Sequence, residues 1–165
     1  MIQTTTLYVN GADYPLAIDT SEILVDVLRD RLGLKSVKKG CNEGDCGACT
    51  VLIDGRAIAS CTYLAVEAEG RKITTIDGLR GKDGGLHPLQ QAFIDCFAVQ
   101  CGFCTPGMIL ACVSMLRDNP DPDEDEIRET LRGNICRCTG YTKIIDAVNQ
   151  AKEALKARKG AGHAG

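Results

Sequence analysis

Ten cysteines in 165 residues constrain this chain more than any other feature of its sequence. The N-terminal segment lacks a basic region followed by an apolar run and a cleavage site, so we expect no export signal and a cytoplasmic location. Thiols stay reduced in the cytoplasm, and the cysteines are therefore expected to bind metal rather than to form disulfides. Because the chain has only two histidines, the ligands must be thiolates, which favours zinc or iron-sulfur clusters.

The first group of cysteines begins in the stretch GCNEGDCGACT. It comprises Cys41, Cys46, Cys49 and Cys61. The C-x4-C-x2-C spacing is that of plant-type 2Fe-2S proteins. Glycines lie between these cysteines, as expected where a backbone wraps closely around sulfur and points its N–H groups inward. The alternative is a zinc knuckle, but zinc ribbons favour paired C-x2-C units, so the spacing favours an iron-sulfur cluster.

The second group of cysteines lies in the stretches QCGFCTPGM and NICRCTGYTK. It comprises Cys101, Cys104, Cys136 and Cys138. Each pair directly precedes an expected helix, and the partial positive charge of a helix N-terminus suits an anionic cluster bound by four thiolates. A zinc site fits poorly here, because one residue separates the last two cysteines where zinc sites usually have two. We therefore expect a second 2Fe-2S cluster.

Two cysteines, Cys96 and Cys112, remain outside these groups. Both fall in expected helices among apolar neighbours. Free cysteine behaves as a small buried hydrophobe, so we expect both to pack in the core.

Hydrophobic periodicity predicts an α+β protein in which residues 1–77 form the first domain. A hairpin turns at Asn10-Gly11, and a helix follows whose apolar residues run from Ile23 to Leu32 with Thr20 or Ser21 as its N-cap. After the cysteine loop we expect three short strands: Thr50 to Ile53, Ala57 to Cys61 and Lys72 to Ile76. The glycine-rich run 78–85 is typical of a linker.

Residues 86–159 have helical periodicity throughout and predict a four-helix bundle. The first helix starts at His87-Pro88 and is expected to continue through Phe97, and the second starts at Thr105-Pro106. A third follows an acidic run, and a fourth begins near Tyr141. The Gly/Ala-rich residues 160–165 are expected to form a flexible tail.

Composition excludes two classes of function. No stretch approaches the roughly 20 apolar residues that span a bilayer. A net charge of −3 without a basic stripe argues against nucleic-acid binding. The chain also lacks a nucleophile-base pair and a G-x-G-x-x-G loop, so we expect no catalytic residues of its own.

The combined motifs GCNEGDCGACTVLIDG, QCGFCTPGM and GNICRCTGYTKI resemble the small iron-sulfur subunit of the molybdenum hydroxylases, the xanthine oxidase and aldehyde oxidoreductase family. The resemblance extends from about Thr6 to Ala157. It implies a ferredoxin-like β-grasp domain followed by a helical domain, and an electron-transfer role within an oxidoreductase. It also implies that Gln100 and Cys138 contact a molybdopterin.

The resemblance implies partner chains as well. A large subunit would hold the molybdopterin, often as the cytosine dinucleotide, and a medium subunit would hold FAD. The subunits would assemble as a dimer of heterotrimers, and electrons would pass between molybdenum and flavin through the two clusters. Two alternatives stay open: a free-standing two-cluster ferredoxin, and a zinc-stabilised interaction module without redox activity.

Overall fold

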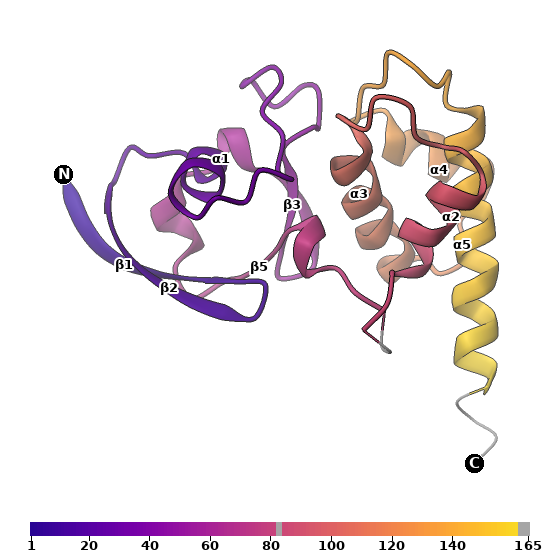
Figure 1. Ribbon diagram of the computed structural model, residues 1–165, viewed down its shortest axis with the longest axis horizontal. Coiled ribbons are helices and arrows are strands. Elements are labelled where there is room, and N and C mark those ends of the chain that lie inside the picture. The colour runs from indigo at the N-terminus through magenta and orange to yellow at the C-terminus, as the bar shows by residue number, and fades with distance from the viewer. Residues whose placement is uncertain (82–83, 162–165) are drawn as a thin grey trace.

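The computed structural model describes residues 1–81 and 84–161, and it places a sheet domain beside a helical domain (Figure 1). The sheet domain comes first in the chain, and four helices make up the second domain. The α+β class is therefore confirmed, whereas the regular bundle arrangement of the four helices stays a prediction.

A single mixed sheet forms the first domain, with the strand order β2-β1-β5-β3-β4. Its strands are β1 (Ile2–Val9), β2 (Ala12–Asp19), β3 (Thr50–Ile53), β4 (Arg56–Ala59) and β5 (Lys72–Thr74). β1 pairs with β2 antiparallel and with β5 parallel. The hairpins turn at Asn10-Gly11 and Asp54-Gly55, where all four residues have positive φ, as tight two-residue hairpins require.

The helix of the sheet domain differs from our prediction. α1 covers only Leu24–Asp26 and continues as a π-helical turn, Val27–Arg31. Its N-cap is Ile23, without a side-chain hydrogen bond, so the expected caps were wrong. The side chain of Ser21 does not cap the helix. Its hydroxyl and its N–H instead donate to Asp19 Oδ1, at 2.6 Å and 2.9 Å. The middle of the expected apolar run was right, since Leu24, Val27 and Leu28 are fully buried, whereas its ends, Ile23 and Leu32, are only partly buried.

The last two strands of this domain end earlier than we expected. β4 stops at Ala59, and Cys61 lies in a 3-10 turn, Ser60–Thr62, rather than in a strand. The Ser60 hydroxyl donates to the Cys49 carbonyl at 2.6 Å, which turns the chain toward the cysteine loop. β5 stops at Thr74, before another 3-10 turn, Ile76–Gly78.

Four helices form the second domain. They are α2 (Pro88–Asp95), α3 (Thr105–Asp118), α4 (Glu124–Leu131) and α5 (Thr142–Ala161). The expectation that the first helix reaches Phe97 was wrong, because α2 ends at Asp95 and Phe97 adopts a left-handed conformation with a φ of 55°. The expected tail was wrong for residues 160 and 161, which belong to α5. Residues 162–165 of the expected tail and 82–83 of the expected linker lie outside the described residues.

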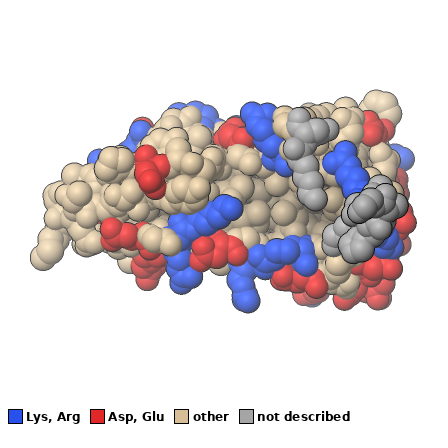
Figure 2. Space-filling view, turned by 90° about the horizontal axis from the view of Figure 1, so that it is seen from below, with Lys and Arg blue, Asp and Glu red and all other residues tan. Residues whose placement is uncertain are grey.

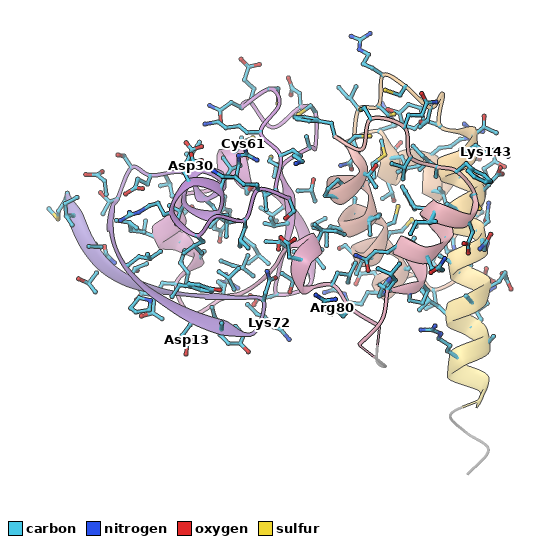
Figure 3. The ribbon with its side chains drawn as sticks, viewed as in Figure 1. Asp13, Asp30, Cys61, Lys72, Arg80 and Lys143 are labelled. Carbon is cyan, nitrogen blue, oxygen red and sulfur yellow. The ribbon has the colours of Figure 1, made fainter. Side chains whose placement is uncertain are left out.

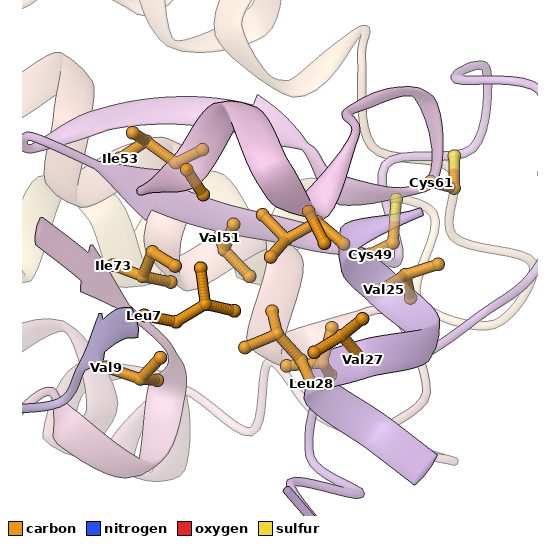
Figure 4. Packing of buried hydrophobic residues seen from close by; sticks show 14 of the residues in the cluster. Leu7, Val9, Val25, Val27, Leu28, Cys49, Val51, Ile53, Cys61 and Ile73 are labelled. Atoms are coloured by element: carbon orange, nitrogen blue, oxygen red, sulfur yellow. The ribbon is translucent and has the colours of Figure 1, made fainter. Parts of the chain in front are cut away.

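Each domain has a hydrophobic core of its own. One core gathers buried residues between Leu7 and Ile73 around the sheet and α1 (Figure 4). The other gathers buried residues between Leu89 and Ala151. Separate cores support our proposed division into residues 1–77 and 86–159.

The two domains meet where α3 packs on β3 and β4 (Figure 1). The Ala57 N–H at the edge of the sheet donates to Ser114 Oγ at 3.2 Å. Arg117 Nη1 donates to the Asp54 carbonyl at 3.1 Å, in the β3-β4 turn. This packing places the start of α3, which follows two of the cysteines, next to the cysteine loop of the sheet domain.

The surface carries charges of both signs. On the face shown in Figure 2, basic and acidic side chains are interspersed, without a continuous basic stripe. None of the helices in the described part of the chain combines the length and the apolar character needed to cross a membrane.

Candidate metal centres

The first cysteine group surrounds the loop that leads into β3, and backbone amides point at its sulfurs. The N–H groups of Glu43 and Cys46 donate to Cys41 Sγ at 3.4 Å, and the Cys41 N–H donates to Cys46 Sγ at the same distance. The amides of Glu43 and Cys46 lower the pKa of Cys41 to about 6. This loop therefore stabilises negative charge on sulfur.

The other two cysteines of this group lie at the edge of the sheet-domain core. Cys49 and Cys61 are buried, and their side chains extend in the same direction (Figure 4). Cys61, labelled in Figure 3, lies on the side of the domain that carries the cysteine loop. Burial, and then a hydrogen bond with Cys49, raise the pKa of Cys61 to about 11. A buried thiol of this kind becomes a thiolate readily only when a metal binds it.

Gly40 has no side chain, and this leaves room for the sulfur of Cys46. A Cβ atom at this position would lie 2.8 Å from Cys46 Sγ, closer than real Cβ atoms approach other atoms. The same Cβ would lie 3.7 Å from the ring of Phe103, which comes from the second cysteine group. The backbone at Gly40 therefore passes directly beside both a sulfur and the neighbouring domain.

The second cysteine group lies at the starts of two helices. α3 begins directly after Cys104, and α5 begins four residues after Cys138. Cys136 Sγ accepts hydrogen bonds from the N–H groups of Cys138 and Thr139 at 3.4 Å and lies 3.1 Å from the Thr139 hydroxyl. Burial opposes ionisation of Cys136, but the Thr139 hydroxyl and these amides together lower its pKa. Amides of the loop before α5 thus donate to sulfur, and the partial positive charge of two helix N-termini lies near this group.

The sulfurs of each group form two close pairs. Cys101 and Cys138 have their Sγ atoms 3.6 Å apart, and Cys104 and Cys136 are hydrogen-bond partners. In the first group, Cys41 is the hydrogen-bond partner of Cys46, and Cys49 is that of Cys61.

This pairing fits a binuclear cluster better than a single metal ion. In a 2Fe-2S cluster each iron takes two thiolates, so the ligands form pairs. A zinc site would require four ligands around a single point.

The structure also places the remaining residues that we singled out. Gln100 is exposed, and its Nε2 donates to the Cys138 carbonyl at 3.1 Å, so the two expected molybdopterin contacts lie together on the surface. Cys112 is fully buried in the helical core, as expected. Cys96 is only partly buried and donates to Gln150 Oε1 at 3.1 Å. Both lie outside the sulfur pairs.

Three residues beside the second group have roles that sequence inspection missed. Asn134 and Tyr141 make hydrogen bonds to the cysteine-bearing backbone, and Thr139 makes one to a cysteine sulfur. The available signal was their position within two or three residues of a cysteine. That position does not reveal which atoms they contact, because the contacts depend on how the loop folds.

Comparison with known proteins supports this geometry. Residues 7–76 match the family described as "2Fe-2S iron-sulfur cluster binding domain", and residues 75–149 match the "[2Fe-2S] binding domain" family. The nicotinate dehydrogenase small FeS subunit of Eubacterium barkeri is 47% identical over 150 residues, which cover 91% of this chain and 95% of that protein. The xanthine dehydrogenase iron-sulfur-binding subunit of Escherichia coli O157:H7 is 50% identical over 143 residues, which cover 85% and 88%.

A solved structure has the same fold. The crystal structure of quinoline 2-oxidoreductase from Pseudomonas putida 86 contains a chain that superposes with a TM-score of 0.88 at 44% identity, covering 96% of this chain and 98% of that one. Identity at this level over both domains, together with the sulfur pairs, leaves one assignment. This chain belongs to the family of small iron-sulfur subunits of the molybdenum hydroxylases, with two 2Fe-2S-binding domains, and is a subunit of an oxidoreductase.

Proposed function

We propose that this chain passes electrons between a molybdopterin cofactor and FAD, both held by partner chains, through two 2Fe-2S clusters. The first cluster is bound by Cys41, Cys46, Cys49 and Cys61, and the second by Cys101, Cys104, Cys136 and Cys138. A 2Fe-2S cluster supplies one-electron redox chemistry. One observation carries the proposal: the Ile135 N–H, directly before Cys136, donates to the carbonyl of Cys46 at 2.9 Å. This hydrogen bond connects the backbone of the second ligand group directly to that of the first.

The protein's own contribution is to hold the thiolates and to set their charge environment. Amides of Glu43, Cys46 and Cys138 point at sulfur in the two groups. Hydrogen bonds to sulfur stabilise the more negative, reduced form and so raise the reduction potential. The two sites differ in these donors, because a hydroxyl, that of Thr139, joins the amides at the second site. We therefore expect two different potentials.

The exposed end of the second group supports the proposed direction of the relay. Cys101 and Cys138 are both exposed, and Gln100 lies beside them. The Gln100 amide can donate and accept, which suits the edge of a pterin. We propose that this surface faces the molybdopterin, present as the cytosine dinucleotide in a large subunit. The first cluster then faces FAD in a medium subunit, within a cytoplasmic dimer of heterotrimers.

Purification of the chain together with the proteins that bind it tests this function. We expect two partner chains, one with molybdopterin and one with FAD, and four irons per copy of this chain, because two binuclear clusters require four. Reduction with dithionite should give two distinguishable paramagnetic 2Fe-2S signals. A chain that purifies alone and serves as a diffusible electron donor would instead be a free ferredoxin. A colourless chain that contains zinc would contradict both functions.

A variant of Gln100 tests the proposed molybdopterin contact. In the complete enzyme, Gln100→Ala is expected to slow electron transfer from the molybdenum centre to the second cluster roughly 10-fold to 100-fold, the usual effect of losing a residue that supports a metal site. Rapid-freeze electron paramagnetic resonance, with an aldehyde or N-heterocycle that the enzyme oxidises, measures this rate. The matched control is Gln91→Ala, since Gln91 is exposed on α2 and pairs with Asp95. Equal rates in the two variants would argue against the contact.

A further inference from the structure

A buried asparagine connects the two cysteine loops. Asn134 is 3% exposed, and its Nδ2 donates to the carbonyl of Gly47 at 3.0 Å. Gly47 directly follows Cys46, so this bond ends within the first ligand group. The next residue, Ile135, donates to the carbonyl of Cys46. Two adjacent residues of the helical domain are therefore bonded to two adjacent carbonyls of the sheet domain.

A tyrosine hydroxyl fixes this asparagine to the second ligand group. Tyr141 Oη donates to the Asn134 carbonyl at 2.9 Å and accepts from the Cys136 N–H at 2.8 Å. A phenol is suited to this position because it donates and accepts through one atom. Asn134 and Tyr141 thus form a bracket, by which we mean the hydrogen-bonded path from Gly47 through Asn134 and Tyr141 to Cys136.

The backbone of Tyr141 is strained. Its φ is 69°, in the left-handed region that bulky residues seldom adopt. Such a conformation persists only where surrounding contacts enforce it, and the two hydrogen bonds of its hydroxyl are contacts of that kind.

Two glycines allow the chain to approach the bracket closely. A Cβ atom on Gly47 would lie 2.5 Å from Asn134 Nδ2, and one on Gly107 would lie 2.3 Å from the Gly47 carbonyl oxygen. A side chain at either glycine would therefore collide with the bracket, and the absence of both side chains lets the Gly47 carbonyl approach the asparagine amide.

Two further hydrogen bonds between the domains lie farther along α3. They involve Ser114 and Arg117 and reach the β3-β4 hairpin. α3 starts at the cysteine loops and runs away from them (Figure 1). The bracket adds a side-chain connection at the other end of this interface, where the two ligand groups approach each other.

We propose that Asn134 and Tyr141 are positioning residues that hold the two 2Fe-2S clusters at a fixed separation and orientation. This inference rests on the proposed electron-transfer function and deepens it. The rate of electron transfer falls steeply with distance, so a relay with one defined separation has one defined rate. Neither side chain is a cluster ligand in this proposal, and both act through the backbone that carries the ligands.

Tyr141→Phe and Asn134→Ala in the complete enzyme test the bracket. We expect both variants to retain the iron content of the wild type. In the fully reduced protein, magnetic coupling between the two clusters splits their paramagnetic resonance signals, and we expect this splitting to change or broaden. Amide hydrogen exchange in segments 40–50 and 134–141 should become about tenfold faster or more, because Asn134→Ala loses one hydrogen bond of the bracket and Tyr141→Phe loses two.

Matched controls separate this role from a general loss of stability. Tyr8→Phe removes the hydroxyl of an exposed tyrosine on β1, and Asn149→Ala shortens a partly exposed asparagine on α5. Both controls should leave the splitting unchanged.

Three outcomes would overturn either the proposed role of the bracket or the electron-transfer function on which it rests. Unchanged splitting and exchange in Tyr141→Phe would show that the bracket does not position the clusters. Loss of iron in Tyr141→Phe, which keeps its ring, would make the residue necessary for cluster binding rather than for positioning. Absence of two cluster signals in the wild type would instead overturn the proposed function.

Discussion

Cys104→Ser is expected to remove about half of the iron from this protein while the other cluster persists. Serine oxygen is a harder and much less acidic ligand than cysteine sulfur, so it binds iron poorly at neutral pH. Burial and the hydrogen bond with Cys136 make the site still less suited to an ionised hydroxyl. The signal of the second cluster should disappear on reduction, and Cys46→Ser should remove the first signal instead. Iron analysis and paramagnetic resonance of the reduced protein measure both effects.

Cys112→Ala provides the control for these ligand variants. Cys112 lies in the same helical domain, is fully buried, and has its pKa raised to about 12 by burial. The variant should keep both clusters, because its thiol lies outside the sulfur pairs. If Cys104→Ser retained the full iron content, the proposed division of the eight cysteines into two ligand groups would be wrong.

Gly47→Ala is expected to produce the largest loss of stability among glycine variants of the cysteine loop. Gly47 has a φ of 68°, and a Cβ atom there would lie 2.1 Å from the carbonyl oxygen of Gly133. The left-handed conformation alone costs alanine about 1–2 kcal/mol. The clash also separates Gly47 from Asn134, and the unpaired buried groups add about 1–3 kcal/mol. A decrease on the order of 10 °C in the midpoint of thermal unfolding follows for a protein of this size.

Gly70→Ala isolates the clash from the backbone strain. Gly70 has a φ of 70°, but no atom lies within 4 Å of the position of its Cβ. Its variant should show the strain alone, a decrease of roughly 4 °C. Thermal unfolding followed by far-ultraviolet circular dichroism at one heating rate measures both variants. Equal decreases would mean that the contact between Gly47 and the 133–134 segment adds no stability.

Much of the fold could be predicted because its signals are local. Hairpin turns at Asn10-Gly11 and Asp54-Gly55 follow from the conformations that those residue pairs allow. The predictions that were wrong concern the ends of elements. α2 stops before Phe97, and Cys61 lies in a turn stabilised by the hydrogen bond between Ser60 and Cys49. That bond joins residues 11 positions apart, and the hydrophobic periodicity of a single segment does not predict it.

The amino-acid sequence by itself determined the chemistry of this protein. Eight cysteines at these spacings predict thiolate ligands for iron, because the type of ligand and its spacing can be read from the sequence alone. Only the tertiary structure decided how the two groups face each other. The bond between Asn134 and Gly47 joins residues 87 positions apart, and it lies at the interface where α3 packs on the sheet domain. Separations of this kind result from packing between domains, which no local pattern encodes.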